Sequence, residues 1–385
     1  MRCLDNVILA FLNYVSMQES PELFKTWTAI SVMSATLGRN VWIDRGFYRI
    51  FPNHYIILLA ASAECRKSVI ARIGMDLLTK AKIIEIGAER ITNAALWQWL
   101  DEAREKTGKS EIFIFSDELG LSLSKEETQK GVISTLTRAY HCPDLLINKT
   151  KTAGVDQVEN CCINILAATT PTDFAAIIPG ASTGTGFTSR LHSAYQEIPC
   201  PRRAELIKDK ELEKRLIQDL QHIRALKGEI AIEPDAWAWW KHWYEKELKF
   251  PENELLDSFY GRKHDYVLKL GMIVSLSEQD ELVVRKKDLT RALPLLNQLE
   301  SFMGDTYSMV GGEPYLLHAD RVVKQLLKAG GKLSRSEILQ RNSRQIGAEE
   351  LTRIMLHLQA AETVQSQMVG GKTIYLLKGG KKDGK

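Results

Sequence analysis

The sequence predicts an α/β fold with a parallel β-sheet at its centre. Between residues 55 and 198, short apolar runs alternate with segments of helical periodicity, as in β-α-β units. Polar residues that suit phosphate and magnesium follow two of these runs: Lys67 and Ser68 after one, Asp117 and Glu118 after another. Because parallel strands end at the same edge of a sheet, the pattern predicts a ligand site at that edge.

Length and composition limit the possibilities before any motif is considered. A chain of 385 residues is expected to form two or three domains, and 44% hydrophobic with 26% charged residues is typical of a globular protein. The net charge is only +3, so any nucleic-acid-binding surface has to be local. The six cysteines lack metal-ligand spacing, which favours reduced thiols and no structural zinc. The apolar stretch 7–15 lacks a basic leader, so we expect a cytoplasmic protein.

Residues 1–50 are expected to form an N-terminal helical collar. Helical spacing runs through residues 4–40, and a second helix is predicted to begin with Ser20 as its N-cap and Pro21 in its first turn. Residues 41–50 then predict a β-hairpin.

The segment after the first buried strand predicts an altered P-loop. In the pattern G-x-x-x-x-G-K-[ST], the lysine reaches the β and γ phosphates of ATP and the hydroxyl holds Mg²⁺. Lys67 and Ser68 supply these two groups, whereas Ala61 and Arg66 occupy the glycine positions. The residues expected to surround the phosphates with them are Ala61, Ser62, Ala63, Glu64, Cys65 and Arg66. An ordinary strand-to-helix turn is the alternative.

The acidic pair after the run 111–116 has the features of a Walker B element. Four consecutive apolar residues predict a strand buried on both faces. At its end, Asp117 is expected to help hold Mg²⁺ and Glu118 to orient or deprotonate the attacking water. A capped strand end with two solvated acids is the alternative.

A further buried strand is predicted at 161–168, and it ends next to Thr170. A hydroxyl at the tip of such a strand can contact the γ-phosphate or the attacking water, so Thr170 is a candidate sensor. The glycine-rich loop 180–186 follows, and we expect it to be mobile and to present Arg190 at the surface before a strand at 193–198.

The order of these motifs resembles an AAA+ ATPase core, in which an arginine of an S-R-F-D-like segment reaches the nucleotide of the neighbouring subunit. More narrowly, several segments are similar to phage and prophage ATPases of the primase-helicase or replicative-helicase type: FKTWTAISVMSATLGRNVWI, PNHYIILLAASAECRKS, IFSDE, NILAATTP and GFTSR. That group accepts an R-K-[ST] loop without the second glycine. The resemblance covers roughly residues 5–300 and depends on the ordered set, because no single motif is strong.

The resemblance implies an activity and partners. It implies an ATPase that uses ATP and Mg²⁺, and a DNA helicase or helicase loader in phage or mobile-element replication. The expected partners are single-stranded or forked DNA, other replication proteins and further copies of the chain in a ring, such as a hexamer, with no membrane. Arg190 would then act in trans on a neighbour, while the other site residues would act within their own chain.

Residues 203–310, after the ATPase core at 51–202, are expected to form a helical lid domain. The helix predicted at 235–249 carries four tryptophans, which suit either base stacking or core packing. Arg262 opens a helix where AAA+ lids often carry a second phosphate sensor, so the resemblance assigns it to the nucleotide. A solvated basic helix end is the alternative.

Residues 311–380 predict a winged-helix domain. Helices are expected at 319–329, up to Arg341 and at 348–360, followed by two strands joined by a Gly-Gly turn as the wing. The third helix would be the recognition helix, and the basic residues near it are Arg341, Arg344, Arg353 and Lys372. Such domains bind DNA or proteins, and both remain open. Residues 381–385 form a basic tail.

Two functional hypotheses follow from the sequence. The first is an ATP-driven DNA motor that uses the residues above. The second is a non-motor DNA-binding or scaffold protein, in which Ala61 and Arg66 mark a degenerate nucleotide site. Turnover of ATP distinguishes the two.

Overall fold

The chain folds into two compact units, Met1–Tyr307 and Ser308–Lys385, which are described separately. The computed structural model describes residues 2–61, 65–87, 91–118, 126–150, 154–177, 186–196, 200, 202–251, 256–311, 319, 322–323, 325–342 and 346–378. Within these ranges, no helix combines the length and apolar character needed to cross a membrane.

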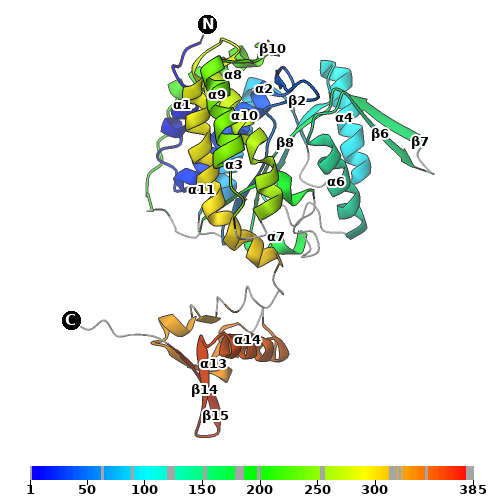
Figure 1. The fold of residues 1–385 in the computed structure, drawn as a ribbon. Coiled ribbons are helices and arrows are strands. Elements are labelled where there is room, and N and C mark those ends of the chain that lie inside the picture. The colour runs from blue at the N-terminus through cyan, green and yellow to red at the C-terminus, as the bar shows by residue number, and fades with distance from the viewer. Residues whose placement is uncertain are drawn as a thin grey trace. The chain divides into compact units, whose positions relative to one another are not determined.

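A five-stranded, all-parallel sheet forms the centre of the first unit, in the order β4-β5-β8-β3-β9 (Figure 1). Its strands are β3 (Tyr55–Leu59), β4 (Glu85–Gly87), β5 (Glu111–Ser116), β8 (Cys162–Thr169) and β9 (Leu191–Tyr195). All residues of β3, β5, β8 and β9 are buried, which explains their apolar character. The prediction of an α/β fold with a parallel sheet is confirmed.

Helices cover both faces of this sheet. They are α1 (Val7–Tyr14), α2 (Glu22–Leu37), α3 (Lys67–Ala81), α4 (Asn93–Thr107), α6 (Glu126–Ala139), α7 (Pro171–Ile177) and α8 (Lys210–Arg224). Helices α2 and α3 contact each other and β8, while α4 and α6 contact each other on the opposite side of β8 in Figure 1. Gly74 of α3 allows the close approach of α2, because a Cβ there would lie 2.6 Å from Cγ2 of Thr28.

The remaining elements of the first unit surround this core. They are β1 (Val41–Asp44), β2 (Arg49–Ile50), β6 (Leu145–Thr150), β7 (Gly154–Glu159), η2 (Thr188–Arg190), β10 (Gly228–Glu229), β11 (Ala231–Ile232), α9 (Pro234–His242), η3 (Trp243–Glu247), α10 (Asp257–Glu278), β12 (Val283–Val284) and α11 (Lys286–Gly311). The predicted β1–β2 hairpin is confirmed. The β6–β7 hairpin, which projects from the body in Figure 1, has no counterpart among the predictions.

The aromatic cluster of α9 serves mainly in packing. Trp240 and Trp243 are buried, and Trp237 stacks on Trp240 with their ring centroids 5.0 Å apart. These contacts favour the core-packing alternative for Trp240 and Trp243, whereas Trp237 is partly exposed.

The predicted start of α2 is wrong in one respect. Pro21 is the N-cap of the helix and no side chain caps it, whereas Ser20 donates a hydrogen bond from Oγ to the carbonyl oxygen of Arg66 at 3.3 Å. The serine therefore ties the N-terminal segment to the loop after β3.

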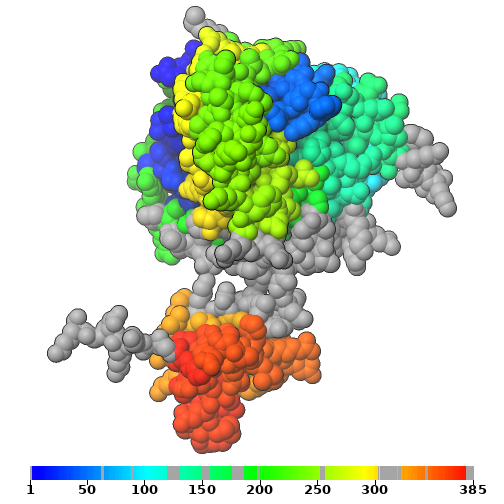
Figure 2. All heavy atoms as spheres, viewed as in Figure 1, coloured from blue at the N-terminus to red at the C-terminus, as the bar shows by residue number. Residues whose placement is uncertain are grey.

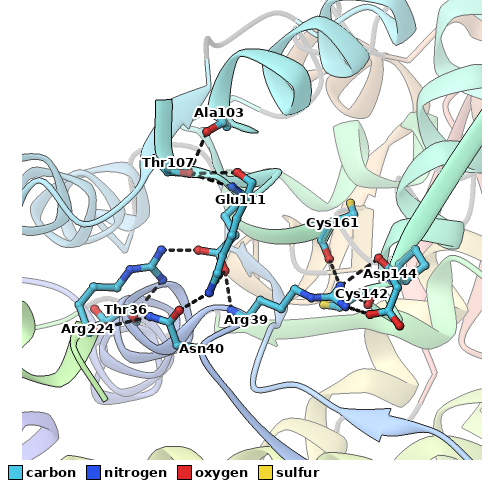
Figure 3. Close-up of polar contacts among 12 residues, drawn as sticks. Thr36, Arg39, Asn40, Ala103, Thr107, Glu111, Cys142, Asp144, Cys161 and Arg224 are labelled. Atoms are coloured by element: carbon cyan, nitrogen blue, oxygen red, sulfur yellow. Dashed lines mark hydrogen bonds and ion pairs between the residues drawn. The ribbon is translucent and has the colours of Figure 1, made fainter. Parts of the chain in front are cut away.

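A buried ionic network holds the amino-terminal edge of the sheet together (Figure 3). Glu111 begins β5 and is only 2% exposed. Its carboxylate accepts a hydrogen bond from the backbone N–H of Arg39 at 2.8 Å and pairs with the guanidinium of Arg224, near the end of α8. Gly38 ends α2 at φ 51°, and a Cβ there would lie 2.6 Å from Nη1 of Arg224. The ends of α2 and α8 are thus fastened to the start of β5.

The second unit contains a three-stranded antiparallel sheet, in the order β13-β15-β14, packed with helices. Its elements are β13 (Lys332–Ser334), α13 (Arg335–Arg341), α14 (Ala348–Ala360), β14 (Val364–Val369) and β15 (Lys372–Leu377), with further helical residues at 319, 322–323 and 325–328. Gly370 and Gly371, at φ 58° and 78°, turn β14 into β15. The predicted bounds of the last two helices and the Gly-Gly turn are confirmed. Arg344 and residues 381–385 lie outside the described residues.

Candidate functional site

The predicted site residues in this part of the chain follow three neighbouring strands at one edge of the sheet. Lys67 and Ser68 follow β3, Thr170 follows β8, and Asp117 with Glu118 follows β5. Since β8 lies between β3 and β5 and all three are parallel, their carboxyl ends meet there.

The serine and the acidic pair come together at this edge. Ser68 donates from Oγ to the backbone oxygen of Asp117 at 3.3 Å, although the two residues are 49 positions apart. The carboxylate of Asp117 is ion-paired with Arg72, while Glu118 is exposed. Arg72 was not among the predicted site residues. It lies four residues after Ser68 on α3, and this spacing puts both on the same face of the helix.

Lys67 opens α3 and is largely buried against its own loop. Its ammonium donates from Nζ to the carbonyl oxygen of Ala61 at 3.3 Å, which joins the start of α3 to a residue just after β3. Helix α3 begins here, and the positive end of its dipole favours an anion beside its first turn. The predicted contacts of Ser62, Ala63 and Glu64 lie outside the described residues, and Cys65 is buried.

The backbone of Arg66 explains why glycine is usual at this position. It has φ 47° and ψ 32°, a left-handed conformation that costs an L-residue roughly 1–2 kcal/mol. The Arg66 side chain is exposed, and its Nε pairs with Oε2 of Glu19 at 3.2 Å. A hydrogen bond from the backbone N–H of Arg203 and the nearby Arg66 guanidinium together lower the pKa of the Glu19 carboxyl. The loop is therefore held from the N-terminal segment by Glu19 and Ser20.

Thr170 has a structural role as the cap of α7. Its Oγ1 accepts a hydrogen bond from the backbone N–H of Asp173 at 3.1 Å and donates to the Asp173 carboxylate at 2.7 Å. The preceding Thr169, which sequence reasoning missed, is buried, and its hydroxyl has no partner among the described residues. A buried hydroxyl at the tip of β8 can serve a ligand, but no sequence signal separates it from Thr170.

Arg190 and Arg262 lie together, at the opposite edge of the sheet. Arg190 precedes β9, and Nε of Arg262 donates to Oγ of Ser189 at 3.0 Å. Strand β3, with five residues at about 3.3 Å per residue, lies between this edge and Lys67 and spans about 16 Å. The structure therefore does not bring Arg262 together with Lys67.

Arg190 is 6% exposed, contrary to the expectation that its loop presents it at the surface. Its guanidinium donates to the backbone oxygen of Gly186 and lies 3.0 Å from Nε2 of His141. Burial and the neighbouring Arg262 lower the pKa of Arg190. These contacts hold the side chain inward in the single chain.

The residues at the carboxyl edge fit a magnesium ion with a bound triphosphate. Magnesium usually keeps several waters and takes one or two protein oxygens together with phosphate oxygens. The hydroxyl of Ser68 beside the Asp117 segment offers such a partial shell. The described residues contain no cluster of three or more His, Cys, Asp or Glu that could hold a metal ion without a substrate.

Comparison with known proteins adds no assignment to this geometry. No protein-family model matches the chain, and a search of the curated proteins found no match.

Proposed function

We propose that the chain binds ATP with Mg²⁺ at the carboxyl edge of the parallel sheet and hydrolyses it. The observation that carries this proposal is the 3.3 Å contact between Ser68 and the Asp117 backbone. It brings the hydroxyl after β3 and the acidic pair after β5 to one place. The start of α3 and the ammonium of Lys67 supply positive charge beside them.

Each residue has a distinct role in this proposal. Lys67 and the first turn of α3 bind the phosphates, and the lysine stabilises charge that develops on the γ-phosphate. Ser68 and Asp117 would hold Mg²⁺, which neutralises phosphate charge when it is bound. Exposed Glu118 can accept a proton from the attacking water. Arg72 has to release Asp117 before that carboxylate can serve a metal ion.

A steady-state ATPase assay tests the proposal. Lys67→Ala should lower hydrolysis by about a thousandfold, because no second lysine lies in the loop and one electrostatic contact is worth about 10²–10³ in rate. Lys80→Ala is the matched control, since Lys80 lies on the same helix and pairs with Glu213 at the surface. Equal activity of Lys67→Ala and wild type would place the hydrolytic site elsewhere.

We further propose that hydrolysis drives a DNA motor. The second unit supports this, because its order of helices followed by a β-hairpin suits a winged helix, and Arg353 is exposed on α14. Single-stranded or forked DNA should then raise the ATPase rate, and Arg353→Gln should weaken the affinity for DNA. ATP hydrolysis that no DNA alters would contradict the motor.

The ring belongs to the same proposal, with Arg190 acting on a neighbour's nucleotide. Its place at the edge opposite Lys67 is compatible with action in trans, provided that the side chain leaves Gly186 and His141. Hydrolysis per subunit should rise with protein concentration, and mixing Arg190→Ala with Lys67→Ala protein should restore part of the activity. Full activity of Arg190→Ala alone would contradict an active site that two subunits share.

One observation favours the second candidate, a non-motor DNA-binding or scaffold protein. The ion pair between Arg72 and Asp117 occupies the carboxylate that a metal ion needs. Binding of ATP without turnover, under conditions that saturate with Mg²⁺, would support this candidate over the motor.

A further inference from the structure

A hollow at the amino-terminal edge of the sheet combines residues from three elements. It lies between β2, the segment after α6 and helix α10. We call it the basic hollow, and the residues of its lining used below are Tyr48, Arg49, His141, Arg262, Asp265 and Lys269. The β1–β2 hairpin beside it (medium blue in Figure 2) forms part of the molecular surface next to α9.

The basic hollow carries more positive than negative charge. Arg49, Arg262 and Lys269 face a single lining acid, Asp265, whose carboxylate accepts a hydrogen bond from the Tyr48 hydroxyl at 3.1 Å. In the part of the chain that the structure describes, neither Arg262 nor Lys269 forms an ion pair, whereas Arg49 lies 4.0 Å from the carboxylate of Asp144. Burial and the nearby Arg190 lower the pKa of His141 to about 4, so this ring is neutral at pH 7 and does not add to the positive charge.

Lys269 is the least expected of these cations, because it is only 5% exposed. Its ammonium donates to the backbone and side-chain oxygens of Asn53 at 2.9 and 2.8 Å, and it lies 4.1 Å from the ring centroid of Tyr140. These contacts are to neutral groups, and a buried cation without a counter-charge is costly. An anion in the hollow would reduce that cost.

Exposed aromatic rings adjoin the hollow. Phe47 at the tip of the β1–β2 hairpin is fully exposed, and Tyr48 is 45% exposed. The side chain of Arg49, next in sequence, is 51% exposed. A positive groove beside exposed aromatic rings is the usual surface for single-stranded nucleic acids, because phosphates meet the cations and unpaired bases stack on the rings.

We propose that the basic hollow and the hairpin tip bind single-stranded nucleic acid. A backbone phosphate binds at the mouth of the hollow against Arg49 and Arg262, with the buried Lys269 behind them adding positive charge, and a neighbouring base stacks on Phe47 or Tyr48. Duplex DNA fits less well, since its bases are already stacked on each other. The assignment rests on the proposed function in that a DNA motor needs a place to grip its strand, but binding here requires no ATP.

Fluorescence anisotropy of a labelled oligo(dT) with the full chain, in EDTA and without nucleotide, tests the site independently of ATP hydrolysis. Phe47→Ala should weaken binding about tenfold, since one stacked base is worth about 1–3 kcal/mol. Arg49→Gln should weaken binding and lower the slope of log affinity against log salt by about 0.7, because it removes one phosphate contact. Phe250→Ala and Arg104→Gln alter an exposed aromatic and an exposed arginine elsewhere, and they should bind like wild type.

Photocrosslinking separates this site from any DNA contact made by the second unit. An oligonucleotide with 5-iododeoxyuridine should label the tryptic peptide Gly46–Arg49, which contains Phe47 and Tyr48. Three outcomes would each overturn the assignment. Crosslinks could be confined to residues 308–385, Phe47→Ala and Arg49→Gln could bind with unchanged affinity, or duplex DNA could bind as tightly as the single strand. None of these outcomes depends on ATPase activity. A failure of the proposed nucleic-acid site is therefore distinguishable from a failure of the proposed ATP hydrolysis.

Discussion

The two edges of the central sheet use charge in different ways. At the carboxyl edge, Glu118 is exposed and Asp117 is partly exposed beside the start of α3. At the amino edge, Glu111 is buried and its charge is met by groups of the same chain. Exposed charge is available to a ligand, whereas buried and paired charge fixes the positions of the elements that carry it.

The direction of the helices accounts for much of this difference. Helix α3 begins at the carboxyl edge, where the positive end of its dipole suits anions. Helices α2 and α8 end at the amino edge, where carbonyl groups suit cations, and Arg224 lies in the last turn of α8. The basic hollow departs from this division, because its cations exceed the acids that line it.

The largest predicted effect is a loss of stability when the ionic network at the amino edge is broken. Glu111→Ala should lower the free energy of unfolding by about 3–5 kcal/mol, because it leaves a partly buried guanidinium without its counter-charge. Urea denaturation measures this loss. Glu105→Ala, at an exposed position of α4, should change stability by less than about 0.5 kcal/mol. Equal effects would mean that the network does not hold the edge.

Lys269 gives the amino edge a pH dependence. Burial lowers its pKa from 10.5 to about 8. Between pH 8 and 10.5 the unfolded chain therefore binds a proton that the folded chain lacks, so stability should rise with pH through this window. The gain is at most about 3 kcal/mol, at 1.36 kcal/mol per pKa unit. The free energies of unfolding of wild type and Lys269→Met, measured at several pH values, isolate the contribution of this lysine. A constant difference between them would show that the ammonium is not buried.

At the carboxyl edge, the acidic pair should divide its roles. Glu118→Gln should leave Mg-ATP binding intact and slow hydrolysis about a hundredfold, the scale of a positioned base. Asp117→Asn should instead raise the Mg²⁺ concentration required. Nucleotide binding and single-turnover hydrolysis measured on both variants separate the effects, with Glu105→Gln as the control. The same loss of binding in both would argue against separate roles.

The smallest effect should come from Arg72. Arg72→Gln frees the Asp117 carboxylate, and an exposed ion pair is worth about 0.2–1 kcal/mol, so the Mg²⁺ concentration for half-maximal ATPase should fall by a few-fold at most. Titration of Mg²⁺ with Arg104→Gln as control measures the shift. A higher requirement would mean that Arg72 helps to place the acid.

The sequence predicts strands better than it predicts contacts. Apolar runs revealed β3, β5 and β8 because both of their faces are buried, which leaves a local signature. The β6–β7 hairpin was missed because it projects from the body and lacks such a run. Ser20 was assigned to capping, but its partner is 46 positions away. Likewise, no local pattern indicates that Arg262 meets Ser189, whereas the spacing of Ser68 and Arg72 could have indicated their shared face.

The left-handed backbone of Arg66 makes the loop dependent on the start of the chain. Where glycine fills such a position, the loop can adopt its shape unaided. Here the hydroxyl of Ser20 and the carboxylate of Glu19 hold it from outside. The N-terminal segment and the loop before α3 are therefore not interchangeable modules. Transplanting residues 55–81 into another scaffold would separate the loop from its supports, so the loop and its N-terminal supports have to be inherited, or engineered, as one piece.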